Sequence, residues 1–143
     1  MSESLKAIIT KPETRPVVVD ECVALVESEV AGKGLIIRGA FKTVKKIKPG
    51  FVKGAIDGLL DEWIDKMEPY YGTWKADGNG GFSGHLAGSK REVANDLLTV
   101  TDARAETSKH KTAAKMYKKL RPSALNNVET AVPGLAALIE KHL

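Results

Sequence analysis

Residues 52–67 read VKGAIDGLLDEWIDKM, and this stretch decides the fold class. Its apolar residues recur at the spacing of one helix face: Val52, Ile56, Leu59, Leu60, Trp63 and Met67. Its acidic residues and the one that follows fall on the opposite face: Asp57, Asp61, Asp65 and Glu68. The stretch therefore predicts an amphipathic helix whose apolar side must be covered by other elements.

Helical periodicity continues upstream of this stretch. Apolar residues from Val18 to Val30 predict a helix that begins near Thr14 and ends at the glycines 32 and 34. A second apolar stripe runs from Ile37 to Val44 and is closed by a Pro-Gly pair at 49–50.

Downstream, proline and serine residues mark the expected boundaries of further helices. Pro69 is expected to end the central helix or to open a short aromatic one. Ser89 and Glu92 form a predicted capping box before an apolar helix. A basic helix over 109–120 follows, and prolines 122 and 133 are expected to open the last two helices.

No segment alternates apolar and polar residues as a strand would. The sequence predicts an all-α fold, a compact single-domain bundle of roughly six to eight short-to-medium helices. Residues 1–143 form one domain in this interpretation, with a glycine-rich loop at 77–84.

Composition points to a cytoplasmic protein without a transmembrane segment. Hydrophobic residues make up 43% and charged residues 28%, as in ordinary globular proteins. The N-terminal residues lack the apolar core of a signal peptide, and no window approaches the length of a membrane span. The single cysteine, Cys22, excludes an internal disulfide and suits a reducing compartment. It lies on the apolar side of its helix and is expected to be a buried, unreactive thiol.

Charge is distributed unevenly along the chain. Segments 32–53 and 107–128 contain no Asp or Glu, yet they hold 13 of the 22 Lys and Arg residues. The remaining residues carry all 18 acidic side chains and 9 basic ones. Such separation creates a surface field that selects partners by charge.

The cations opposite the apolar stripes of these segments are candidates for binding an anion or a partner: Arg38, Lys42, Lys45, Lys46, Lys111, Lys115, Lys118 and Lys119. Three interpretations remain open: a solvated surface, an anion-binding surface, or docking onto the acidic face of residues 57–68 within the chain or across a dimer. Base-specific readout is disfavoured because lysine predominates over the bidentate residues that read bases.

Aromatic residues cluster after the central helix. Tyr70, Tyr71 and Trp74 are expected either to pack in the core or to form a pocket or interface. Arg104 is a further candidate for the pocket or interface. It lies on the apolar arc of its helix and either extends to solvent or forms a buried ion pair with a carboxylate of another helix, in a structural or ligand-directed role. Asp102 is on the far side of that helix and is not its expected partner.

The sequence offers little catalytic machinery. Histidines 85, 110 and 142 are far apart, and the acidic row of the central helix is expected to be solvated, so no metal site is predicted. The glycine-rich loop lacks a preceding strand and the last glycine of a nucleotide-binding fingerprint. No cofactor and no catalytic residue are predicted.

Three motifs carry a resemblance: VKKIKPG at 44–50, MEPYY at 67–71 and LTVTDARAE at 98–106. With the length, they resemble a small family of uncharacterised bacterial α-helical proteins. The resemblance covers nearly the whole chain, and it implies a bacterial, cytoplasmic, helical protein with no assigned activity.

The function that fits these observations is that of a non-catalytic helical interaction protein, which presents a basic surface to nucleic acid or to an acidic protein. Self-association into a homo-oligomer is compatible with this interpretation. One alternative is a small-ligand or lipid-binding bundle with an aromatic-lined pocket. A second is an enzyme whose site is assembled from distant residues.

Overall fold

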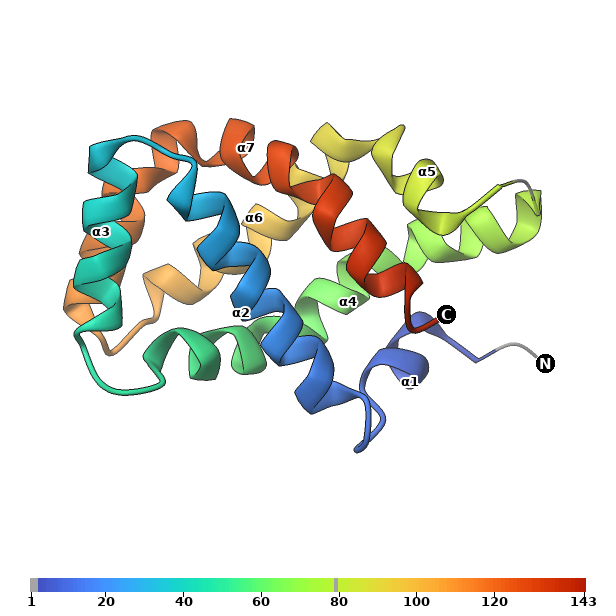
Figure 1. Cartoon of the computed structure of the whole chain (residues 1–143), viewed down its shortest axis with the longest axis horizontal. Coiled ribbons are helices and arrows are strands. Elements are labelled where there is room, and N and C mark those ends of the chain that lie inside the picture. The colour runs from blue at the N-terminus through green and yellow to red at the C-terminus, as the bar shows by residue number, and fades with distance from the viewer. Residues whose placement is uncertain (1–2, 79) are drawn as a thin grey trace.

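The structure is a computed structural model that describes residues 3–78 and 80–143 (Figure 1). These residues form seven helices and no strand, which confirms the predicted all-α bundle of six to eight helices. The helices are α1 (Leu5–Ile9), α2 (Arg15–Ala31), α3 (Leu35–Lys45), α4 (Phe51–Asp77), α5 (Phe82–Ala87), α6 (Lys90–Glu106) and α7 (Lys111–Glu140).

Helix α7 packs against α2, α3, α5 and α6. α5 and α6 lie along it, and α2 lies across both α4 and α7 (Figure 1). The core is built by residues of α2, α4, α6 and α7, to which α1 adds Leu5 and Ile9 and α5 adds Phe82 and Leu86. Helix α3 stands at one end of the molecule and the turn between α4 and α5 at the opposite end, whereas α1 and the C-terminus lie in the half away from α3 (Figure 1).

The apolar face predicted for residues 52–67 is the buried face of α4. Ile56, Leu60, Ile64 and Met67 are buried there, and Trp63 is half-buried. Spacings of three and four residues keep these side chains on one side of the helix, which explains why the pattern was sufficient to predict it.

The expected effect of the prolines was wrong. Pro69 lies inside α4, and both Pro122 and Pro133 lie inside α7, so the predicted basic helix and the two predicted helices after it are one helix. Proline removes one backbone donor and bends a helix, but it does not end one whose apolar stripe continues. Tyr71 extends the buried stripe past Pro69, and Ala136 does so past Pro133. Figure 1 shows the resulting curvature of α7.

The predicted loop at 77–84 is shorter than expected. Helix α4 continues to Asp77 and α5 begins at Phe82; Asn79 lies outside the described residues. Phe82 has no exposed surface, because its ring packs edge-on against Trp74 and Tyr71 at centroid distances of 5.5 and 5.9 Å. The indole N–H of Trp74 also donates to the Gly80 carbonyl at 3.0 Å. These contacts draw the glycine-rich segment onto the core.

The predicted capping box is not formed. Ser89 precedes α6, but its side chain makes no capping hydrogen bond. Its ψ of 25° departs from the extended conformation in which a hydroxyl reaches the first turn. The backbone N–H of Ser89 instead donates to Leu86 and continues the turn that ends α5.

The side chains of Asp57, Asp61 and Asp65 remain about half exposed, as the solvated interpretation of the acidic row predicts, but each carboxylate of the row also has a partner. The Glu68 carboxylate accepts hydrogen bonds from the backbone N–H groups of Leu5 and Lys6 at 2.9 and 3.2 Å, and so caps α1. Lys6 pairs with Asp65 at 3.1 Å. Arg15 pairs with Asp57 and Asp61 at 2.9 and 3.0 Å. The acidic row therefore holds α1 and the start of α2 while it stays partly exposed to solvent.

Candidate functional site

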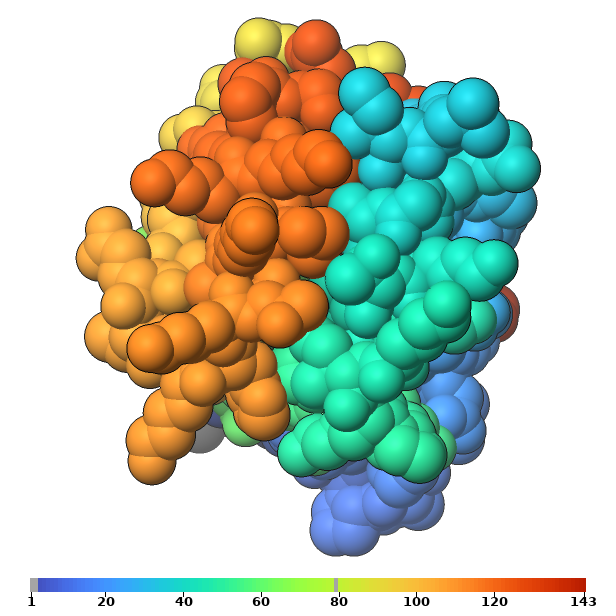
Figure 2. Space-filling model, turned by 90° about the vertical axis from the view of Figure 1, so that its left-hand side faces the viewer, coloured from blue at the N-terminus to red at the C-terminus, as the bar shows by residue number. Residues whose placement is uncertain are grey.

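The two acid-free segments lie side by side. Helix α3 packs against α7, and Figure 2 shows residues near 35–50 and 107–125 adjoining on one face of the molecule. All eight candidate cations are exposed: Arg38, Lys42, Lys45, Lys46, Lys111, Lys115, Lys118 and Lys119. We call these eight residues the basic face. Tertiary packing thus brings together two segments about seventy residues apart in sequence.

Few cations of these segments are neutralised. Among the described residues, three of the thirteen lie within ion-pair distance of a carboxylate: Lys45 with Glu27 at 3.6 Å, Lys53 with Asp20 at 2.8 Å and Arg121 with Asp102 at 2.8 Å. Six of the nine cations elsewhere in the chain are paired. The intrachain docking of the basic segments onto residues 57–68 is also contradicted, since α1 and Arg15 occupy that row. The field of the basic face is left open to solvent.

An apolar edge borders the basic face. Leu35 and Ile36, in the first turn of α3, are 80% and 68% exposed. Ala40 is the one fully buried residue of this helix. Helix α3 thus rests on the molecule by a narrow contact and presents most of its surface outward.

A polar network fastens α7 to α6 beneath the basic face. Tyr117 donates its hydroxyl to Asp102 at 2.5 Å, and Arg121 donates to the same carboxylate at 2.8 and 3.2 Å. The Arg121 guanidinium lowers the pKa of Asp102, and burial together with the Asp102 hydrogen bond raises the pKa of Tyr117 to about 12. Asp102 lies in the motif at 98–106, so that motif serves helix packing.

Replacing Asp102 with Asn should destabilise the protein by about 1 kcal/mol, because the charged hydrogen bond to Tyr117 becomes a neutral one. The exposed Arg121 pair adds little. Since the folded-state pKa of Asp102 is depressed, its contribution is present above the unfolded value of about 3.9 and is lost as pH falls below it. Thermal unfolding at pH 7 and pH 3 tests this. The difference between wild type and variant should shrink at pH 3, and Asp77→Asn, at an exposed carboxylate, should cause no loss.

The aromatic candidates lie against the core beside α5. Tyr71 is buried, Trp74 is half-buried, and both contact Phe82. Tyr70 donates its hydroxyl to Asp96 of α6 at 2.6 Å. None of these three candidates lines the apolar cavity described next.

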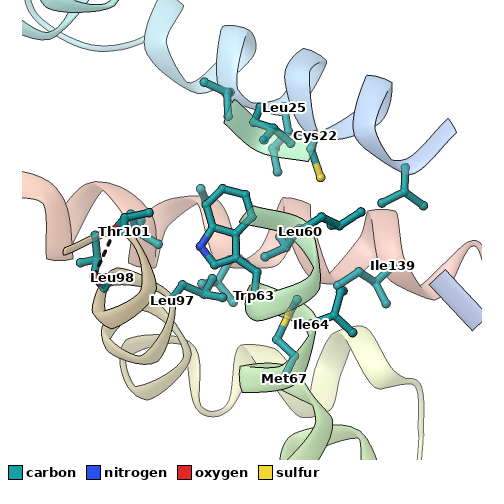
Figure 3. Close-up of a pocket in the computed structure, with 17 residues that line it drawn as sticks. Cys22, Leu25, Leu60, Trp63, Ile64, Met67, Leu97, Leu98, Thr101 and Ile139 are labelled. Atoms are coloured by element: carbon teal, nitrogen blue, oxygen red, sulfur yellow. Dashed lines mark hydrogen bonds between the residues drawn. The ribbon is translucent and has the colours of Figure 1, made fainter. Parts of the chain in front are cut away.

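An apolar cavity of about 190 Å³ lies between α2, α4, α6 and α7 (Figure 3). Trp63 projects into its centre, with Cys22 and Leu25 on one side and Leu98 and Thr101 on the other. The indole N–H of Trp63 is buried and has no hydrogen-bond partner among the described residues. Burial raises the pKa of Cys22 to about 11, so this thiol stays neutral at physiological pH.

Arg104 is half-exposed and pairs with a carboxylate of another helix. One of its terminal nitrogens, Nη2, donates to Glu62 at 2.6 Å and to the Gly58 carbonyl at 3.1 Å, both on α4. This combines the two predicted alternatives, because the side chain reaches solvent and also finds a partner. Asp102 is not that partner, as expected.

The described part of the chain contains no group of three His, Cys, Asp or Glu side chains placed to hold a metal ion. None of its helices combines the length and the apolar character that a membrane crossing requires.

Comparison with known proteins places the chain without assigning it an activity. No curated protein and no solved structure matches it. A family model described as a family of unknown function, DUF6918, matches residues 5–143. That range covers all seven helices. The protein therefore belongs to the DUF6918 family, whose function is unknown.

Proposed function

We propose that the protein is a non-catalytic interaction protein whose basic face binds the phosphate backbone of nucleic acid. The observation that carries this proposal is the juxtaposition of α3 and α7, which joins two acid-free segments into one surface. A phosphate backbone is recognised by clustered Lys and Arg, without further geometric demands.

The composition of the basic face favours contacts that are independent of sequence. Seven of its eight residues are lysine, and lysine meets phosphate as a point charge. The N-terminus of α7 begins at Lys111 without an acidic residue in its first turn, so the helix dipole adds to the positive potential. A reducing, nucleic-acid-containing compartment such as the cytoplasm suits both this partner and the single buried thiol.

The small-ligand alternative has weaker support. The apolar cavity around Trp63 measures about 190 Å³. Pockets for drug-sized ligands usually measure about 300 Å³ or more. The cavity therefore suits at most a ligand of a few carbon atoms, whereas the basic face extends along two helices.

Titration of labelled mixed-sequence duplex DNA and RNA, followed by fluorescence anisotropy, tests the proposed function. If about five cations contact phosphates, the affinity for duplex DNA should fall about 500-fold between 50 and 200 mM salt. Lack of binding at 50 mM salt, or binding that salt leaves unchanged, would contradict the proposal. Binding to a polyglutamate chain that equals binding to DNA would assign the surface to acidic proteins instead.

A further inference from the structure

A second basic feature lies between the start of α4 and the segment joining α6 to α7. It is a groove of about 500 Å³, which is within the usual range for small-molecule sites. Lys48, Arg104, Lys109 and His110 line it, and no carboxylate does. None of these residues is among the eight of the basic face, although Lys48 and Lys109 belong to the same two acid-free segments. We call this feature the Arg104 groove.

The cations of the Arg104 groove retain free hydrogen-bond donors. The described contacts of Arg104 with Glu62 and Gly58 both use Nη2, which leaves Nε and Nη1 available. Lys48 and Lys109 have no carboxylate within ion-pair distance among the described residues. Glu62 reduces the net charge contributed by Arg104, so the two lysines supply most of the positive potential.

The walls of the groove combine hydroxyl groups with an aromatic pair. Thr107 and Ser108 line it, and the Ser108 hydroxyl accepts a hydrogen bond from the His110 backbone N–H at 3.1 Å, which orders this turn. The rings of Phe51 and His110 meet edge to face at a centroid distance of 5.0 Å. Together these groups offer charge, hydrogen-bond donors and aromatic surface.

The floor of the groove is kept open by glycine. Gly54 and Gly58 line it, one turn apart on α4. A Cβ atom built at either position meets no atom within 4 Å. A Cβ atom therefore has room at either position, and a larger side chain there would take up part of the groove.

We propose that the Arg104 groove binds a small organic phosphate monoester, with the phosphate held by Lys48, Arg104 and Lys109 and the organic part against Phe51 and His110. Phosphate is preferred to a carboxylate ligand because three separate cations surround the groove and a phosphate monoester offers three acceptor oxygens. A terminal phosphate of a nucleic-acid chain has the same chemistry as a free nucleotide, so the experiment must separate the two sources.

Isothermal titration with adenosine 5′-monophosphate tests this inference. Saturable binding with a Kd below about 1 mM is expected, and adenosine should bind at least about tenfold more weakly. Equal binding of adenosine, or absence of binding by the monophosphate, would overturn the proposal. A 5′-phosphorylated oligonucleotide that binds tighter than its unphosphorylated form, while the monophosphate does not bind, would assign the groove to chain ends.

Gly58→Leu is the decisive variant. Leucine favours helix more than glycine does, so α4 should remain folded while the side chain fills the groove. We expect at least about tenfold weaker monophosphate binding. Gly72→Leu is the matched control, because Gly72 is an exposed glycine of the same helix with the same open space and lies outside the groove. Unchanged binding by Gly58→Leu, or equal loss in both variants, would contradict the assignment. The double variant Lys115→Glu/Lys119→Glu changes the basic face and should leave monophosphate binding intact. Monophosphate binding therefore tests the groove independently of whether the basic face binds nucleic acid.

Discussion

Replacing Lys115 and Lys119 with Glu is expected to weaken the binding of duplex DNA about 100-fold at 50 mM salt. Both residues lie on the exposed side of α7, one turn apart. Their reversal removes two phosphate contacts, adds two repulsive charges and should reduce the salt slope by about 2. The fold should persist, because neither side chain is buried or paired with a carboxylate among the described residues.

Lys66→Glu/Lys90→Glu is the matched control for this variant. These lysines are also exposed and unpaired within the described part of the chain, and either double substitution lowers the formal net charge from +4 to 0. The control should bind DNA within about threefold of wild type if contacts at the basic face matter. Equal losses in the two variants would show that net charge alone drives binding and would remove the support for a local surface. Anisotropy titrations at two salt concentrations measure both effects.

Replacing Phe82 with Ala is expected to lower the free energy of unfolding by about 3–5 kcal/mol. The Phe82 ring is fully buried and contacts both Trp74 and Tyr71, so its removal leaves a cavity and also eliminates two aromatic pairs. For a protein of this size such a loss is a large part of the total stability, which is typically about 5–15 kcal/mol.

Urea unfolding followed by circular dichroism measures this loss without relying on the fluorescence of Trp74. Leu35→Ala is the control, since that side chain is 80% exposed and its truncation should change stability by less than about 0.5 kcal/mol. A Phe82→Ala loss below about 1 kcal/mol would mean that α5 does not depend on this contact.

The sequence predicts the class of fold well because the strongest signals are local. The stripe through Ile56, Leu60 and Met67 predicts α4, and its period is a property of the helix itself. The start of α2 near Thr14 and the acid-free character of the segments around α3 and α7 are equally visible without a structure. These features need no knowledge of what each helix packs against.

The errors arise where distant residues compete with local signals. Proline is normally a helix breaker, but apolar residues on both sides of Pro133 hold α7 together through contacts with other helices. The partners of the acidic row were also not predicted, because Glu68 caps the backbone of Leu5, more than sixty residues away. The adjacency of the two basic segments likewise depends on how α3 docks on α7. Lys48 and Lys109 line the Arg104 groove. The sequence pattern does not predict them as anion-binding residues, although both lie in the acid-free segments.

The position of Leu143 in the fold determines which surface remains free when a label, a bead or a fused domain is attached there. Helix α1 and the last turn of α7 lie in the half of the molecule away from α3 (Figure 1). A label, a bead or a fused domain joined at Leu143 would therefore sit far from the lysine-rich surface. If the protein is immobilised through Leu143, every copy would expose the basic face to solution, as an affinity matrix or a tethered adaptor requires.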